Sequence, residues 1–295
     1  MAIYNNCTVK AYGKLNLMLD ILGRSSNGYH LLNTVMQSIS CYDLLKISLT
    51  DGSGIEIKCD KEDFPCDESN LIWKACTAFK ESTNIDFGGK LVIEVEKNLP
   101  SMAGMGGGSA DCAAMLGALN VMYGTFLEDE ELCKIGGKLG ADVPFCICGG
   151  TRLCQGIGEK TFRLPTPDCC FTVIKPDTNI STAEAYEKYD SLKKTGSGDL
   201  DQFLQALASN NIYRYSSHMY NALEDVSQNE EIEKAKEQLM KSGAVNAMMT
   251  GSGSAVFGIY TNKQSAEFAC EQLGVYEFKE VCEPVKCGYE IVYKK

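Results

Sequence analysis

The chain has 295 residues, of which 44% are hydrophobic and 23% are charged, and its formal net charge is −11. This length predicts two lobes or one large α/β body. The acidic balance disfavours a surface for nucleic acid or for an anionic membrane, although a local basic pocket for phosphate is compatible with it.

Neither a targeting signal nor a membrane span is predicted. Residues 1–14 contain no basic segment followed by an apolar run, and no stretch approaches the roughly 20 apolar residues of a spanning helix. We therefore expect a cytoplasmic protein.

The chain contains 15 cysteines but only two histidines. An odd cysteine count in a long chain without a secretory signal argues against a disulfide framework. No C-x-x-C spacing occurs, so zinc-ligand spacing is absent. Most of the cysteines are expected to be small buried hydrophobic residues.

The first strand is predicted by alternation. From Lys14 to Ile21 every odd position is leucine or isoleucine, which predicts a strand with one apolar face. Lys14 and Asn16 then share the opposite face. Further strands are expected at residues 44–49 and 55–58.

The next part of the chain predicts a helix at 69–79 and a strand at 91–96. A glycine-rich segment follows at 98–109, and two helices are expected at 110–124 and 128–139. Small residues form the stripe of the helix over 110–124, so this helix should pack very close to its neighbour. Asp142 follows the last helix.

A proline-containing stretch at 161–168 predicts a boundary between an N-terminal lobe, 1–160, and a C-terminal lobe, 161–295. The C-terminal lobe is expected to contain strands, helices and one loop, namely a strand at 171–175, a helix after Ser181, a loop at 195–199, helices at 230–241 and 264–273, and a strand at 288–293. Mixed rather than strictly alternating strands and helices favour an α+β fold over a doubly wound sheet.

The glycine-rich segment is suited to phosphate. Four of the five residues 104–108 are glycine, and they precede a helix. Glycines let backbone N–H groups approach an anion, and the helix adds the positive end of its dipole. A Walker A motif is excluded because Leu139 follows Gly137-Lys138, and a dinucleotide motif is excluded because Ser109 replaces its third glycine. The alternative is a tight turn that allows close packing; phosphate binding is favoured.

Two motifs resemble those of the GHMP kinase superfamily. Residues 100–110, PSMAGMGGGSA, resemble the P-x3-G-L-G-G-G-S-S loop that surrounds ATP phosphates in these enzymes. Residues 247–257, AMMTGSGSAVF, resemble the glycine loop of their second lobe. The chain departs from the usual pattern at Gly13, Met105 and Ala110, and Ala110 lacks a hydroxyl that a serine would offer to phosphate or metal.

Other segments narrow the resemblance to one family. The chain is closely similar to 4-diphosphocytidyl-2-C-methyl-D-erythritol kinases at residues 14–17, 28–30, 35–39, 139–145, 156–159 and 181–186. The resemblance implies a two-lobe α+β GHMP kinase fold with a ribosomal-protein-S5-like N-terminal lobe, a ferredoxin-like C-terminal lobe and the active site between them. It also implies ATP-dependent phosphorylation of the 2-hydroxyl of 4-diphosphocytidyl-2-C-methyl-D-erythritol in non-mevalonate isoprenoid precursor biosynthesis.

The same resemblance assigns residues to ATP. The ATP-binding loop is expected to comprise Pro100, Ser101, Met102, Ala103, Gly104, Met105, Gly106, Gly107, Gly108, Ser109 and Ala110. No dedicated metal cage is visible in the sequence, so Mg²⁺ is expected to arrive with ATP, with Ser109 as a candidate contact.

Phosphoryl transfer to an alcohol needs a charge-neutralising group and a proton acceptor. Lys14 can supply the first and Asp142 the second, and the resemblance makes them the catalytic pair, oriented by a salt bridge. From the residues alone, Asp142 is equally well explained as an N-cap of a following helix, and a lone strand lysine is usually solvated. Asn16 either donates to the substrate diphosphate or satisfies the backbone; we favour the substrate.

Tyr29 and His30 follow a turn and offer a flat surface and a hydrogen-bonding ring to a nucleobase. The alternative for Tyr29 is an aromatic side chain that covers the edge of the core. By resemblance these two residues hold cytosine, Tyr186 closes the sandwich, and Thr182 also contacts the substrate.

Two other functions are considered. One is another small-alcohol kinase of the superfamily, of the homoserine or mevalonate type, whose substrates lack the nucleobase that Tyr29 and His30 would bind. The other is a catalytically silent nucleotide-binding sensor, which has no need of Lys14 and Asp142. The expected partner is a small-molecule substrate, and the sequence leaves monomer and homodimer open.

Overall fold

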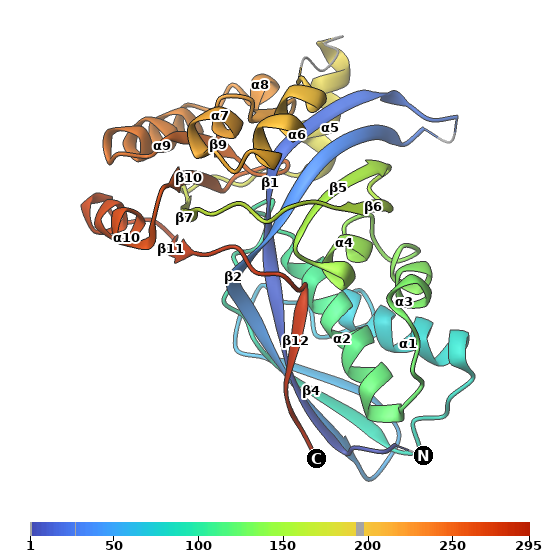
Figure 1. Ribbon diagram of the computed structural model, residues 1–295. Coiled ribbons are helices and arrows are strands. Elements are labelled where there is room, and N and C mark those ends of the chain that lie inside the picture. Colours follow the sequence, from blue (N-terminus) through green and yellow to red (C-terminus); the bar gives the residue numbers. More distant parts are fainter. Residues whose placement is uncertain (1, 27, 193–197) are drawn as a thin grey trace.

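The computed structural model describes residues 2–26, 28–192 and 198–295. These residues form an α+β structure with two sheets, which confirms the expected fold class (Figure 1). Within these ranges, no helix combines the length and apolar character needed to cross a bilayer. The expected loop at 195–199 lies largely outside the described residues, because 195–197 are not among them.

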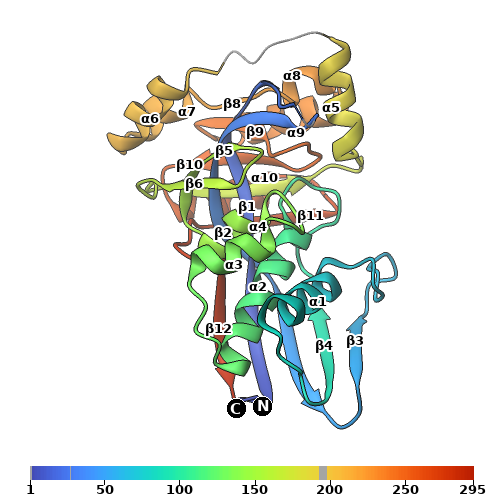
Figure 2. The same ribbon diagram turned by 90° about the vertical axis from the view of Figure 1, so that its right-hand side faces the viewer.

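The first sheet has eight strands in the described part of the chain, namely β1 (Asn6–Arg24), β2 (His30–Thr50), β3 (Gly54–Cys59), β4 (Lys90–Glu96), β5 (Thr151–Gly156), β6 (Lys160–Arg163), β8 (Tyr220–Asn221) and β12 (Tyr289–Lys294). Its main order is β12-β1-β2-β4-β3; β5 joins β2, β6 joins β5, and β8 joins β1. The hairpin of β1 and β2 runs from the end of the molecule where the termini lie to the region of α5, the helix over Thr182–Ser191 (Figures 1 and 2).

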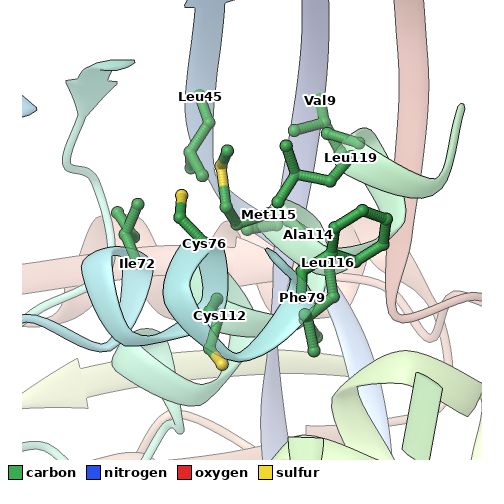
Figure 3. Packing of buried hydrophobic residues seen from close by; sticks show 14 of the residues in the cluster. Val9, Leu45, Ile72, Cys76, Phe79, Cys112, Ala114, Met115, Leu116 and Leu119 are labelled. Atoms are coloured by element: carbon green, nitrogen blue, oxygen red, sulfur yellow. The ribbon is translucent and has the colours of Figure 1, made fainter. Parts of the chain in front are cut away.

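Four helices lie on one face of this sheet, α1 (Leu71–Thr83), α2 (Gly107–Tyr123), α3 (Asp129–Gly136) and α4 (Val143–Cys148) (Figure 2). Side chains of α1, α2, β1 and β2 fill the space between helices and sheet, among them Phe79, Met115, Val9 and Leu45 (Figure 3). Gly117 of α2 lies so close to Tyr289 that a Cβ there would be 2.3 Å from the tyrosine ring, which confirms the close packing expected of the small-residue stripe.

The second sheet is antiparallel in the order β11-β7-β10-β9, with β7 (Cys170–Lys175), β9 (Asn246–Met249), β10 (Val256–Tyr260) and β11 (Phe278–Cys282). The helices of this half of the chain are α5 (Thr182–Ser191), α6 (Leu200–Ala208), α7 (Ile212–Ser216), α8 (Glu224–Ser227), α9 (Glu230–Lys241) and α10 (Lys263–Gln272). Both α9 and α10 pack on this sheet, through buried residues that include Ile232, Leu239 and Ala266.

The lobe boundary expected after residue 160 stays a prediction. Strand pairing links the two proposed lobes, because β12 at the end of the chain pairs with β1 and β8 also pairs with β1. The C-terminal strand thus belongs to the sheet that carries Lys14.

Candidate active site

A cavity of about 630 Å³ lies beside the sheet that carries Lys14. Of the residues predicted for the site, it is lined by Lys14, Asn16, Pro100, Ser101, Met102, Ala103, Gly104, Met105, Gly106, Gly107, Gly108, Ser109, Asp142, Thr182 and Tyr186. The structure therefore brings together residues from distant parts of the chain. Ala110 is fully buried in α2 beneath the loop, and Tyr29 and His30 are not part of the lining.

Lys14 and Asp142 meet in this cavity. The Lys14 Nζ atom lies 3.5 Å from Asp142 Oδ2. The lysine side chain is 4% exposed, whereas the aspartate side chain is 37% exposed. The ammonium is thus held inside the protein, while the carboxylate stays open to a molecule in the cavity.

The alternative role for Asp142 is that of an N-cap of the following helix. Asp142 does occupy the N-cap position of α4, but its side chain makes no capping hydrogen bond. A carboxylate at an N-cap normally accepts a backbone N–H of the first turn. Here it faces the lysine instead, so the capping explanation does not account for the side chain.

The glycine-rich segment forms a loop and the first turn of α2, which begins at Gly107, earlier than expected. Gly106 is the N-cap in a left-handed conformation, with φ of 73°. A Cβ on Gly106 would lie 3.0 Å from Lys14 Cγ, and Met105 O accepts a hydrogen bond from Lys14 N at 2.9 Å. The loop therefore lies directly against the lysine.

The start of α2 offers donors to an anion. The first N–H groups of an α-helix have no acceptor within the helix, and the helix dipole adds positive potential there. Gly107, Gly108 and Ser109 belong to this first turn and line the cavity. This arrangement suits phosphate oxygens.

A second loop, residues 250–254, packs directly against the glycine-rich loop. Thr250 Oγ1 accepts from Asn16 N at 3.0 Å, and Ala255 N donates to Ala103 O at 3.2 Å. Gly104 has φ of +72°, and a Cβ there would lie only 2.1 Å from Thr250 O. The two glycine loops are thus in direct backbone contact.

Asn16 connects the lysine to this second loop. Its Oδ1 accepts from Lys14 Nζ at 2.7 Å and from Thr250 Oγ1 at 3.3 Å, and its Nδ2 donates to Thr34 Oγ1 at 2.8 Å. The side chain is 3% exposed. These contacts orient Lys14, and the expected contact of Asn16 with substrate stays a prediction.

The residues predicted to hold a nucleobase are only partly assembled. The rings of His30 and Tyr186 are stacked with centroids 4.4 Å apart. His30 Nε2 lies 2.9 Å from Asp190 Oδ1, and Asp190 also pairs with Arg24, which together with His30 lowers the pKa of this carboxyl. Tyr29 is 61% exposed and does not line the cavity.

Thr182 and Ser109 also take defined positions. The hydroxyl oxygens of Thr182 and Ser252 are 3.0 Å apart, which joins the start of α5 to the second glycine loop. Ser109 lies near the segment before Asp142, since a Cβ on Gly140 would be 3.7 Å from Ser109 Oγ. Ser109 and Asp142 line the same cavity.

Sequence reasoning missed a buried ionic cluster of Lys97, Asp43 and Asp111, of which Lys97 and Asp111 line the cavity. Lys97 Nζ contacts Asp43 Oδ2 and lies 2.9 Å from Asp111 Oδ2. Burial lowers the pKa of Lys97, but Asp111 and Asp43 more than offset this, so its pKa is raised. Burial raises the pKa of Asp111 to about 7, although Lys97 opposes the shift. The sequence signal for this cluster is Asp111, the one acidic residue of α2, which lies among its small residues.

Asp43 also orients the chain that enters the glycine loop. Its Oδ1 accepts from Asn98 N at 2.7 Å and from Leu99 N at 2.8 Å. The ionic cluster and the first glycine loop are therefore one connected structure.

The described residues contain no group of three or more histidine, cysteine or acidic side chains that could hold a metal ion. All 15 cysteines are free.

Comparison with protein families places the cavity in a known context. Residues 70–150 match the GHMP kinases N terminal domain, and residues 189–276 match the GHMP kinases C terminal domain. The first match contains the glycine loop and Asp142.

Individual relatives are similar over almost the whole chain. A 4-diphosphocytidyl-2-C-methyl-D-erythritol kinase of Clostridium botulinum (strain Alaska E43 / Type E3) is 41% identical over 268 residues, which cover 90% of this chain and 95% of the relative. A crystal structure of a 4-(cytidine 5'-diphospho)-2C-methyl-D-erythritol kinase is 28% identical with a TM-score of 0.79, covering 93% of this chain and 98% of that one. A homoserine kinase of Cytophaga hutchinsonii has the same fold, with a TM-score of 0.78, 18% identity and 99% coverage of both chains.

Proposed function

Because this chain belongs to the GHMP kinases and, within them, to the 4-diphosphocytidyl-2-C-methyl-D-erythritol kinases, we propose that it phosphorylates 4-diphosphocytidyl-2-C-methyl-D-erythritol. The γ-phosphate of ATP is transferred to the 2-hydroxyl of this alcohol, a step of non-mevalonate isoprenoid precursor biosynthesis. The observation that carries the proposal is the convergence of Lys14, Asp142 and the start of α2 on one cavity.

The phosphates of ATP bind at residues 100–110. The left-handed Gly106 and the first turn of α2 present backbone N–H groups where only small side chains intervene. The contact between Gly104 and Thr250 fixes the shape of the loop before any ligand binds. Because these donors are already in place, little conformational entropy of the protein is lost when ATP binds.

Asp142 accepts the proton of the substrate hydroxyl. As the oxygen–phosphorus bond forms, the O–H bond breaks and its proton moves to the carboxylate, while ADP leaves with the electrons of the broken phosphorus–oxygen bond. The 37% exposure of the Asp142 side chain allows a hydroxyl to reach it. Lys14 offsets negative charge on the transferred group, and its buried position strengthens that interaction.

The substrate is held by other residues of the same cavity. Thr182 and Tyr186 line the cavity, and His30 stacks on Tyr186. We assign Tyr29, His30 and Tyr186 to the cytosine ring and Asn16 and Thr182 to the rest of the substrate. Binding of the base between rings would require His30 and Tyr186 to separate or Tyr29 to turn inward.

Mg²⁺ fits this site as an ion carried by ATP. The described residues supply no carboxylate cage. Ser109 offers a hydroxyl on the first turn of α2, where it lines the cavity. This is the sparse oxygen set with which Mg²⁺ is held when phosphates and water complete the octahedron. When bound, the ion would neutralise charge on the phosphates. The expected cytoplasmic location stays a prediction.

A steady-state assay with a panel of alcohols tests the proposal. ADP release should depend on the cytidine substrate, and phosphorus NMR should place the new phosphate on its 2-hydroxyl. Homoserine and mevalonate should give no more ADP than ATP alone. ATP consumption that ignores the cytidine substrate, or a preference for one of the other alcohols, would contradict the assignment, and binding of ATP without any turnover would indicate a sensor.

A further inference from the structure

A pair of thiols lies outside the proposed chemistry. Cys133 belongs to α3 and Cys148 is the last residue of α4, and their Sγ atoms are 3.6 Å apart. Both residues are partly exposed to solvent. Since a disulfide needs a separation of about 2.0 Å, the sulfurs have only about 1.5 Å to travel.

The surroundings of Cys148 favour its thiolate. Cys133 can donate its S–H to Cys148 Sγ, and Thr161 Oγ1 donates to the same sulfur at 3.8 Å. The pKa of Cys148 is lowered to about 6, mainly by the hydrogen bond from Cys133 and further by Arg152 and Thr161. Burial and the Asp129 carboxylate oppose this shift. The same contact raises the pKa of Cys133, which keeps its proton.

The other thiols among the described residues do not combine a nearby second thiol with partial exposure and a lowered pKa. Cys41 and Cys282 are closer, with Sγ atoms 2.9 Å apart, but Cys282 is fully buried and its pKa is raised well above the ordinary value. Cys66 and Cys287 are exposed to solvent. They serve as accessible comparison thiols within the same chain.

We propose that Cys133 and Cys148 form an oxidation site that hydrogen peroxide converts to a disulfide. The Cys148 thiolate attacks one peroxide oxygen, the O–O bond breaks, and Cys148 becomes a sulfenic acid as the second oxygen leaves as hydroxide. The Cys133 sulfur then attacks the Cys148 sulfur; its proton and the departing hydroxide form water. Two electrons pass from the thiols to the peroxide.

The bond joins two elements of the catalytic lobe. The helix α4 has six residues, with Asp142 at its N-cap and Cys148 at its end. Cys133 Sγ also lies 3.6 Å from Pro144 O, so α3 and α4 are already in contact along this face. Oxidation therefore ties α3 to the helix that presents the proposed catalytic carboxylate.

Peptide mapping of the full chain tests the inference. The protein is treated with hydrogen peroxide, the remaining thiols are blocked with N-ethylmaleimide, and the peptides are identified by mass spectrometry. We expect a peptide pair linked through Cys133 and Cys148 to appear before Cys66 or Cys287 is oxidised, and dithiothreitol to remove the link. Oxidation of Cys66 or Cys287 while Cys133 and Cys148 stay reduced would overturn the proposal.

Three variants separate the roles. Cys133→Ser should stop at the sulfenic acid of Cys148, which dimedone captures, whereas Cys148→Ser should give neither product. Cys66→Ser is the matched control and should form the disulfide like the wild type. A sulfenic acid on Cys133 in the Cys148→Ser variant would overturn the assignment of Cys148 as the nucleophile. The mapping of the wild type decides the main question even where a variant folds poorly.

Discussion

The backbone N–H of Asn16 donates to Thr250 Oγ1 at 3.0 Å, deep between two segments that are far apart in the chain. Thr250 is 0% exposed and also donates to Asn16 Oδ1, the same atom that accepts from Lys14 Nζ. One hydroxyl thus joins the strand that carries Lys14 to the second glycine loop. Thr250 acts as a positioning residue, since it reaches the cavity only through Asn16 and Gly104.

Replacing Thr250 with valine should weaken both folding and catalysis. The change preserves shape but leaves the buried N–H of Asn16 without its acceptor, which costs about 1–3 kcal/mol in the free energy of unfolding. Lys14 then loses part of its orientation, and kcat should fall about tenfold to a hundredfold. Urea unfolding and steady-state kinetics measure the two effects.

The serine variant is the control for this change. Thr250→Ser keeps the hydroxyl and should recover most of kcat. If Thr250→Val lowers stability but leaves kcat at the wild-type level, the residue has a structural role only.

A Gly104→Ala variant tests the contact between the two glycine loops. An added Cβ would lie 2.1 Å from Thr250 O, so one loop must move away from the other. We expect the affinity for ATP to fall by at least about tenfold, or about 1.4 kcal/mol. Isothermal titration calorimetry with ATP measures this loss.

Gly88 offers a matched control, because its φ is +70° beside +72° for Gly104 and no atom lies within 4 Å of an added Cβ. Gly88→Ala introduces the same left-handed backbone strain of about 1 kcal/mol without the clash. It should bind ATP like the wild type. Equal ATP affinity in the two variants would show that the loop contact is dispensable.

The buried ionic cluster predicts a pH dependence of stability. Burial raises the pKa of Asp111 from an ordinary value of 3.8 to about 7. Between these values the folded protein keeps a proton that the unfolded chain has released. This group therefore stabilises the fold fully below the ordinary pKa, and its contribution is lost as the pH rises through about 7, with a slope of at most about 1.4 kcal/mol per pH unit.

Asp111→Asn removes this titration. The variant should be less stable overall, because Lys97 loses a partner, but its free energy of unfolding should change less between about pH 5 and pH 7 than that of the wild type. Urea unfolding at several pH values gives the two slopes. Asp51→Asn, at an exposed bend, should keep the wild-type slope. A wild-type slope in Asp111→Asn would contradict the raised pKa.

Local patterns predicted much of the fold. The apolar periodicity of residues 230–241 gives the bounds of α9 as the structure has them, and the alternation after Lys14 gives the central part of β1. The strand nevertheless begins at Asn6, because β12 and β2 pair with its first half. Such pairing depends on residues near the other end of the chain, which a local pattern does not contain.

The family was predicted correctly from its motifs, and the relatives confirm it. The sequence also predicted that Lys14, Asp142 and the glycine loop would meet. It did not predict the cluster of Lys97, Asp43 and Asp111, because an ion pair between separate elements leaves no spacing in the chain. The roles of the site residues stay predictions that kinetics must test.

Single-turnover transfer by Asp142→Asn tests the central claim most directly. The variant and the wild type are each mixed with labelled ATP and the cytidine substrate, quenched on a millisecond scale, and compared with their Kd for ATP. Because Asp142 is proposed to accept the proton and does not belong to the phosphate-binding loop, the Kd should stay within about threefold while the transfer rate falls by about 10²–10⁴. Asp51→Asn should transfer at the wild-type rate. A wild-type transfer rate in Asp142→Asn would contradict the account.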